Sequence, residues 1–89
     1  MSIAYPTLVL TSEFMESYAR FAAAERRRLL NALARLDTNE RHPALRVHPL
    51  RGDREGQWSA SASDSLRITF ERLPDGRKQL LACSKHYGD

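Results

Sequence analysis

The feature that most constrains the fold is a pair of alternating segments, residues 58–63 and 66–70, in which apolar and polar residues exchange at every position. Alternation with a period of two is typical of strands that bury one face. A turn at residues 63–65 aligns Trp58 with Phe70 and Ala60 with Ile68, so the apolar residues of both strands share one face. A two-residue turn would place apolar and polar residues together on each face. The pattern therefore predicts an antiparallel hairpin whose opposite face carries Ser59, Ser61, Arg67, Thr69 and Glu71.

Helical spacing dominates the region from about residue 12 to residue 37. Thr11 or Ser12 offers an N-cap, and acidic residues follow in the first turn, where the helix dipole favours them. Leucines at positions 29, 30, 33 and 36 recur on one stripe. We expect two helices, or one bent helix, in this region. The three consecutive arginines at positions 26–28 cannot share one helix face, so a solvated surface is favoured for them over docking of a partner protein.

Three further segments are interpreted as strands. Thr7 to Leu10 is a short β-prone run, Leu45 to Leu50 precedes a loop at residues 51–57, and Gln79 to Ser84 follows a Pro-Asp-Gly turn. The unbroken apolar run of residues 80–83 is typical of a central strand covered on both faces. Together these elements predict an α+β fold, in which a short N-terminal strand is followed by two helices packed on an antiparallel sheet of three to four further strands.

The length of 89 residues allows one domain, residues 1–89, with one small core. A hydrophobic share of 42% with 28% charged residues is typical of a folded chain rather than a disordered one. No apolar run approaches the ~18 residues of a membrane span, and the first residues lack the basic start of a signal peptide. The single cysteine, Cys83, fits a reducing compartment. We therefore expect a cytoplasmic protein with no membrane partner.

The net charge of +3 is unevenly distributed along the chain. Acidic and basic residues balance up to residue 40, so the whole excess lies in the second part of the chain, as do the three histidines. Arginine supplies most of the cations, and its planar guanidinium grips phosphate in two places at any working pH. This pattern favours a phosphate-bearing ligand, with a merely solvated basic surface as the alternative.

Three kinds of chemistry can be weighed from the remaining polar residues. A metal site would need His42 and His48 beside Cys83 and His86, but a proline interrupts the first pair and the spacing is a poor match to structural zinc sites. The serines lack the surroundings of a catalytic nucleophile. His48, Arg67 and His86 better match metal-free RNA cleavage, which needs a base, a cation and an acid. The alternative is that each histidine, taken alone, is a bystander near a strand end.

Several short motifs, in their order along the chain, resemble the RelE superfamily of bacterial toxin–antitoxin systems. The segment His48-Pro49-Leu50-Arg51-Gly52-Asp53 with Gly56 is similar to the YafQ branch, and Trp58-Ser59, Leu66-Arg67 and the ending Cys83-Ser84-Lys85-His86-Tyr87 are similar to the YoeB branch. The resemblance covers nearly the whole chain. It implies a microbial RNase-like α+β fold and a ribosome-dependent endoribonuclease toxin that cleaves mRNA in the A site of the 70S ribosome and is silenced by a cognate antitoxin.

The resemblance also implies roles for individual residues. His48 is then the candidate base, Arg67 the cation that stabilises the transition state, and His86 the acid. Tyr87 would position a nucleotide. The cations that would hold RNA phosphates are Arg46, Arg51 and Lys85. No metal and no other cofactor is implied.

The chain departs from the family pattern in two places. Ser59 and Ser61, with Ala60 between them, stand where relatives carry lysine, arginine or histidine, and no glutamate precedes the His-Pro-Leu segment as it does in the YoeB branch. The identity of the general base, and of some of the residues that contact phosphate, is therefore left undecided. Two alternatives follow: a toxin on the same fold that does not cleave RNA, like the ParE poisons of DNA gyrase, and an inactive antitoxin-binding domain.

Overall fold

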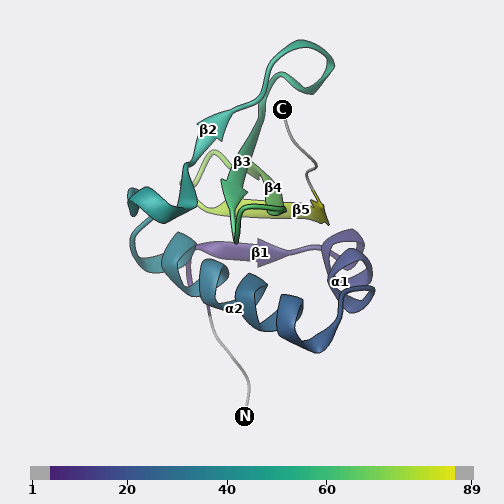
Figure 1. The fold of residues 1–89 in the computed structure, drawn as a ribbon. Helices are drawn as coiled ribbons and strands as arrows, with labels where there is room; N and C mark the ends of the chain where they lie inside the picture. Colours follow the sequence, from purple (N-terminus) through teal and green to yellow (C-terminus); the bar gives the residue numbers. More distant parts are fainter. Residues whose placement is uncertain (1–4, 86–89) are drawn as a thin grey trace.

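The structure, a computed structural model, describes residues 5–85. Its strands form one five-stranded sheet in the order β1-β5-β4-β3-β2, and both helices lie on one side of it (Figure 1). Strand β1 runs parallel to β5, and the other neighbours are antiparallel. The predicted α+β fold is confirmed. In chain order the elements are β1 (Leu8–Leu10), α1 (Ser12–Ala19), α2 (Ala23–Thr38), β2 (His48–Pro49), β3 (Gln57–Ser61), β4 (Leu66–Arg72) and β5 (Lys78–Lys85), with 3₁₀ turns at Pro43–Leu45 and Gly52–Arg54.

Strands β3 and β4 pair in the register that the alternation predicts. Trp58 faces Phe70 and Ala60 faces Ile68. The amide of Ala62 donates to the carbonyl of Leu66 across the turn, at 2.8 Å. The apolar face of this hairpin forms the floor of the core, and its other face is left to polar side chains.

The helices supply the other half of the core. Thr11 caps α1, because its hydroxyl accepts a hydrogen bond from the amide of Phe14 at 3.1 Å. The leucine stripe of helix α2 packs in the core or against it. The two predicted helices are confirmed. Arg27 and Arg28 are exposed, as expected for a solvated face, whereas Arg26 is half-buried and donates from Nη1 to the carbonyl of Phe21 at 2.8 Å. The largest fully buried side chains are Phe14, Leu29, Leu33, Leu36, Leu45, Leu66, Ile68, Phe70 and Leu80.

The strand expected from Leu45 to Leu50 is wrong in extent, because β2 contains only His48–Pro49 and Leu45 belongs to a 3₁₀ turn. Arg46 has left-handed backbone angles (φ 47°, ψ 44°), which a strand cannot contain. Pro49 is the last residue of the strand, and proline, which has no amide hydrogen to donate, is tolerated in a sheet only at an edge or a bulge. Strand β2 lies at that edge.

The central position expected for the last strand is confirmed, since β5 lies between β1 and β4. The prediction that both faces of β5 are fully covered is wrong, because Leu80 and Cys83 are buried whereas Leu81 and Ala82 are half-buried. A β-bulge accounts for the apolar run. Phe70 pairs with Leu80 while the preceding residue of β4 pairs with Ala82, so Leu81 is an extra residue that lets positions 80 and 83 face the same core.

Candidate functional site

A hollow of about 360 Å³ lies on the face of the sheet opposite the helices. Strand pairing brings its residues together: His48 of β2 faces Ser59 of β3, and Ser59 faces Thr69 of β4. Arg67, two residues before Thr69, shares this face and pairs with Ser61. The predicted polar face therefore becomes the floor of a site. The hollow is lined by Arg46, His48, Leu50, Arg54, Ser59, Ser61, Arg67, Thr69 and Ser84.

The hollow is positively charged. Arg46, Arg54 and Arg67 line it, and none of its nine lining residues, all in the described part of the chain, carries a carboxylate. The Nη1 of Arg67 donates to the carbonyls of Ser63, at 2.8 Å, and Leu66, at 3.1 Å. These bonds hold the guanidinium without neutralising it, because a carbonyl is an uncharged acceptor. The site is therefore suited to an anion.

The ring of His48 is oriented by the backbone two residues earlier. Its Nδ1 lies 2.7 Å from the carbonyl oxygen of Arg46. Because a carbonyl oxygen can only accept a hydrogen bond, Nδ1 must carry the proton and donate it. The neutral ring then has an unprotonated Nε2, which is the atom able to take a proton from a ligand. His48 is thus arranged as a base.

Arg46 is the only non-glycine residue with positive φ in the described part of the chain. Left-handed backbone costs an L-residue about 1–2 kcal/mol. Its amide donates to the carbonyl of Pro43 at 3.3 Å, which closes the preceding 3₁₀ turn, and its carbonyl accepts from the His48 ring. Strained conformations of this kind concentrate at functional sites. The path of the chain at Arg46 therefore sets the position of His48.

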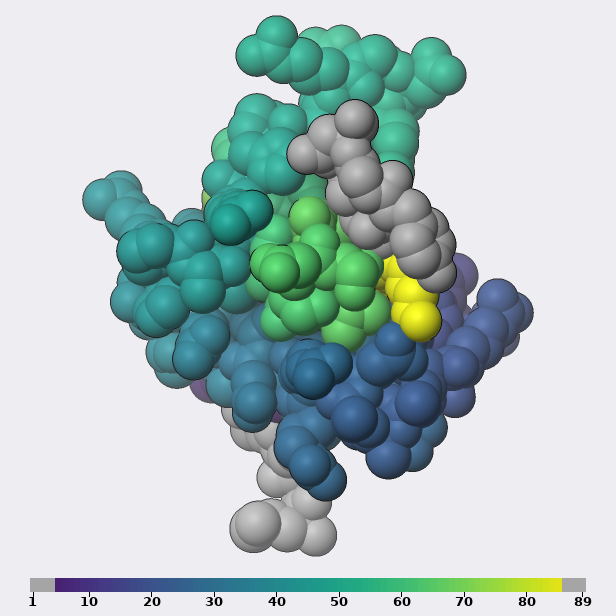
Figure 2. Space-filling model, in the orientation of Figure 1, coloured from purple at the N-terminus to yellow at the C-terminus, as the bar shows by residue number. Residues whose placement is uncertain are grey.

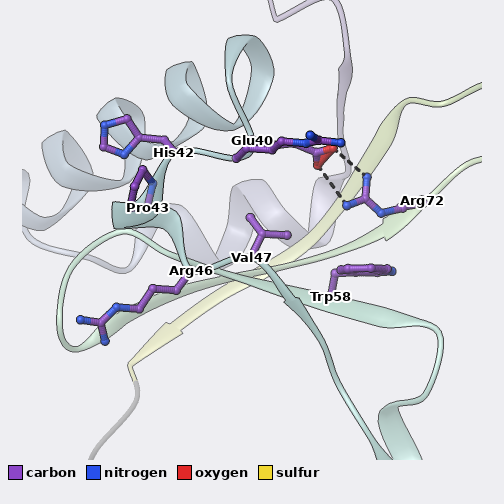
Figure 3. Close-up of a pocket in the computed structure, with 8 residues that line it drawn as sticks. Glu40, His42, Pro43, Arg46, Val47, Trp58 and Arg72 are labelled. Atoms are coloured by element: carbon purple, nitrogen blue, oxygen red, sulfur yellow. Dashed lines mark hydrogen bonds and ion pairs between the residues drawn. The ribbon is translucent and has the colours of Figure 1, made fainter.

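A second and larger hollow, about 460 Å³, lies beside Trp58, on the helix side of the sheet (Figure 3). Its strongest charges are already paired. Arg72 contacts both oxygens of the Glu40 carboxylate, at 3.2 and 3.0 Å, and its guanidinium carbon lies 4.3 Å from the centre of the Trp58 ring. The buried ammonium of Lys78 lies 4.0 Å from the same carboxylate. Figure 3 shows Arg46 at the other end of this hollow, away from the ion pair. Because its one carboxylate, that of Glu40, is already paired with Arg72, this hollow is the weaker candidate site.

The structure brings together three of the residues that the sequence singled out, namely Arg46, His48 and Arg67. Arg51 is exposed and does not line the hollow. The remaining predicted site residues at the end of the chain, His86 and Tyr87, lie outside the described residues.

Lys85, predicted to hold RNA phosphate, also lies away from the hollow. It pairs with Leu66, whose side chain is in the core, and its ammonium lies 2.9 Å from the carboxylate of Glu25 in α2. That bond, followed by one from the amide of Ala22, lowers the pKa of Glu25. The charge of Lys85 therefore faces an acid of its own chain.

Sequence reasoning missed Arg54, which lines the hollow from the connection between β2 and β3. This connection extends beyond the rest of the sheet (Figures 1 and 2). Gly52 and Gly56 have φ values of 69° and 95°, a region that favours glycine, and they let the connection turn back toward β3. Two glycines flanking an arginine were the signal available in the sequence.

The two other features that invited chemistry have structural roles. Nδ1 of His42 accepts from the amide of Ala44 at 3.1 Å and so caps a 3₁₀ turn. Cys83 lies in the core, where burial raises the pKa of its thiol and the sulfur lies 3.3 Å from the hydroxyl of Ser17. Within residues 5–85, no three His, Cys, Asp or Glu side chains gather closely enough to hold a metal ion. Nor, in that part, is any helix long and apolar enough to cross a membrane.

Solved structures of bacterial toxins have the same fold as this chain. The YoeB/ParE toxin from Agrobacterium tumefaciens matches 91% of this chain and 99% of its own, with a TM-score of 0.71 and 21% identity. The YoeB–YefM complex from Staphylococcus aureus matches 90% and 95%, with a TM-score of 0.69 and 17% identity. The E. coli DinJ–YafQ toxin–antitoxin complex matches 93% and 94%, with a TM-score of 0.68 and 16% identity. No protein-family model and no curated protein matches the chain. The likenesses confirm the RelE-like fold.

Proposed function

We propose that this protein is a toxin of a toxin–antitoxin system and acts as a ribosome-dependent mRNA endoribonuclease. The observation that carries the proposal is the hollow on the polar face, in which an oriented histidine, His48, and a fixed arginine, Arg67, share a positively charged surface without a carboxylate among its lining residues. The toxin fold of the solved neighbours supports it.

The proposed reaction uses acid–base chemistry without a metal. Nε2 of His48 takes the proton of a 2′-hydroxyl, and the resulting oxygen attacks the adjacent phosphorus. Arg67 and Arg46 stabilise the negative charge that develops on the phosphorane. The bond from phosphorus to the 5′-oxygen breaks, and His86, the acid that the resemblance implies, protonates that oxygen. The products are a 2′,3′-cyclic phosphate and a 5′-hydroxyl end.

A cognate antitoxin is the proposed protein partner. Two of the solved neighbours are complexes, YoeB with YefM and YafQ with DinJ, and the latter is described as a toxin–antitoxin complex. An antitoxin segment with acidic side chains would complement the cationic hollow and exclude mRNA from it. The other proposed partners are the 70S ribosome and its mRNA, and the site of action is the cytoplasm.

The test is cleavage of a defined mRNA on programmed ribosomes. Purified wild-type protein is expected to cut within the A-site codon and to leave a 2′,3′-cyclic phosphate, with no cut when ribosomes are omitted. His48→Ala and His86→Ala are expected to lower the rate by about 10²- to 10⁴-fold, and Arg67→Ala by about 10²- to 10³-fold.

Matched controls come from the same chain. His42→Asn keeps an acceptor that can cap the 3₁₀ turn, and Arg77→Ala removes an exposed arginine outside the hollow, so both are expected to cleave like wild type. Thermal unfolding checks that the variants are folded. Intact mRNA with wild-type protein would overturn the nuclease proposal. Inhibition of DNA gyrase is then the next activity to measure, because Ser59 and Ser61 replace the expected basic residues on β3.

A further inference from the structure

Arg54 reaches across the polar face from outside the sheet. Its Nη2 donates to the hydroxyl of Thr69 at 3.2 Å, and its Nε donates to the side-chain carbonyl of Gln57 at 3.3 Å. Both acceptors are uncharged, and no carboxylate in the described part of the chain lies within ion-pair distance of Arg54. Glu71, two residues beyond Thr69, does not line the hollow. The guanidinium is therefore held in place while its charge and several of its donors stay available.

The floor beneath Arg54 contains two hydroxyls with unused hydrogen-bonding capacity. Ser59 is 6% exposed and Ser61 is 7% exposed, and both line the hollow. Neither hydroxyl has a hydrogen-bond partner among residues 5–85, and neither oxygen is among the fully buried unpaired atoms of that part, so both are open to the hollow. Each hydroxyl can donate one hydrogen bond to a ligand.

We propose that Arg54, Ser59 and Ser61 form a phosphate-binding site for the RNA backbone, and that Arg54 supplies its positive charge. The inference rests on the proposed function, because it names RNA as the ligand of the same hollow. A guanidinium above two hydroxyl donors matches the oxygens of a phosphodiester. A cation would meet only like charge in this hollow, since its charged lining residues are arginines. The connection between β2 and β3 thus supplies a cation to this site, to which β3 contributes only Ser59 and Ser61.

Arg77 offers a matched control for Arg54. It is also exposed, it lies in the turn between β4 and β5, and it does not line the hollow. Removing either arginine lowers the net charge of the protein by the same amount. A difference between the two variants therefore reports on position and not on overall charge.

The experiment measures binding of a short 2′-O-methyl RNA, which cannot be cleaved by 2′-hydroxyl attack, by fluorescence anisotropy over a series of salt concentrations. Loss of one phosphate contact makes the slope of log K against log salt shallower by about 0.7 for a single strand. Arg54→Ala is expected to weaken binding and to change the slope by this amount, with partial rescue in Arg54→Lys. Arg77→Ala is expected to keep the wild-type slope.

The hydroxyls are tested with the double variant Ser59→Ala and Ser61→Ala. A purely structural role predicts unchanged RNA affinity, because neither hydroxyl bonds to the described protein, whereas the proposed site predicts weaker binding with unchanged thermal unfolding. Titration with inorganic phosphate, followed by NMR of the amides of residues 59 and 61, separates a small phosphate ligand from RNA. Saturation by phosphate with no RNA binding would overturn the RNA assignment.

Failure of this site and failure of the nuclease proposal are distinguishable. Wild-type affinity and slope in Arg54→Ala would overturn the phosphate site, whatever the cleavage assay shows. Conversely, RNA binding that depends on Arg54, combined with intact mRNA on the ribosome, would support the site and overturn the nuclease activity.

Discussion

The left-handed backbone at Arg46 allows its side-chain and backbone contributions to be separated by a pair of substitutions. Asparagine tolerates positive φ, whereas a β-branched valine strongly disfavours it. Arg46→Asn and Arg46→Val both remove the guanidinium from the hollow. Only Arg46→Val is expected to turn the chain away from φ 47° and so to withdraw the carbonyl that accepts from Nδ1 of His48.

The size of the effect follows from that one hydrogen bond. A net hydrogen bond is worth about 0.5–1.5 kcal/mol, and each 1.4 kcal/mol is a factor of ten in an equilibrium. Loss of the bond at 2.7 Å is therefore expected to lower the ratio of the His48 form with a bare Nε2 to the other neutral form by roughly 2- to 12-fold. The cleavage rate of Arg46→Val is expected to fall below that of Arg46→Asn by at most this factor, because the rate follows the fraction of rings with a bare Nε2.

Nitrogen NMR of the His48 ring measures the two neutral forms directly, and cleavage on programmed ribosomes measures the rate. RNA affinity is expected to fall equally in both variants, because both lack the guanidinium. Identical proportions of the two His48 forms in Arg46→Asn and Arg46→Val would refute the idea that the backbone at Arg46 orients the ring. This NMR readout does not depend on nuclease activity.

Three further predictions concern stability and reactivity. Leu33→Ala, at a core position 1% exposed, is expected to destabilise the fold by about 2–5 kcal/mol in urea unfolding, and a loss under 1 kcal/mol would contradict the packing described. Cys83 is expected to react with iodoacetamide far more slowly in the native protein than in urea, because burial raises its pKa and Ser17 contacts the sulfur; equal rates would place the thiol at the surface. Glu25, whose pKa is lowered in the folded state chiefly by Lys85, stabilises the fold above the ordinary carboxyl pKa of 4.5 and loses that contribution as the pH falls through its lowered value. Urea unfolding of Glu25→Gln is therefore expected to show a deficit at pH 7 that shrinks in acid, and a deficit constant with pH would argue against this ion pair.

Much of the fold could be predicted because it depends on local periodicity. The alternation around Ser61 and Arg67 is compatible with one register only, and the structure has that register. The leucine stripe of α2 and the cap at Thr11 are likewise decided within a few residues of sequence. The strand expected from Leu45 to Leu50 was wrong because Arg46 is left-handed, and an arginine gives no local sign of that conformation.

Less of the candidate site could be predicted from the residues. The resemblance to the RelE superfamily pointed to His48 and Arg67, which do share the hollow. It also pointed to Arg51 and Lys85, which have the right charge but lie elsewhere, because phosphate-binding ability was judged by residue type and position along the chain. Arg54 was missed for the same reason.

The sequence by itself determined which faces of the hairpin and helices are apolar, because alternate strand positions and every third or fourth helix position face the same way wherever the element lies. Only the tertiary structure decided which charges meet. Arg54 lines the hollow because Gly52 and Gly56 turn a connection back toward the sheet, and Lys85 is drawn to Glu25 because β5 ends beside α2. Contacts of this kind join residues far apart in the chain, so they exist only when the whole sheet and its connections are in place.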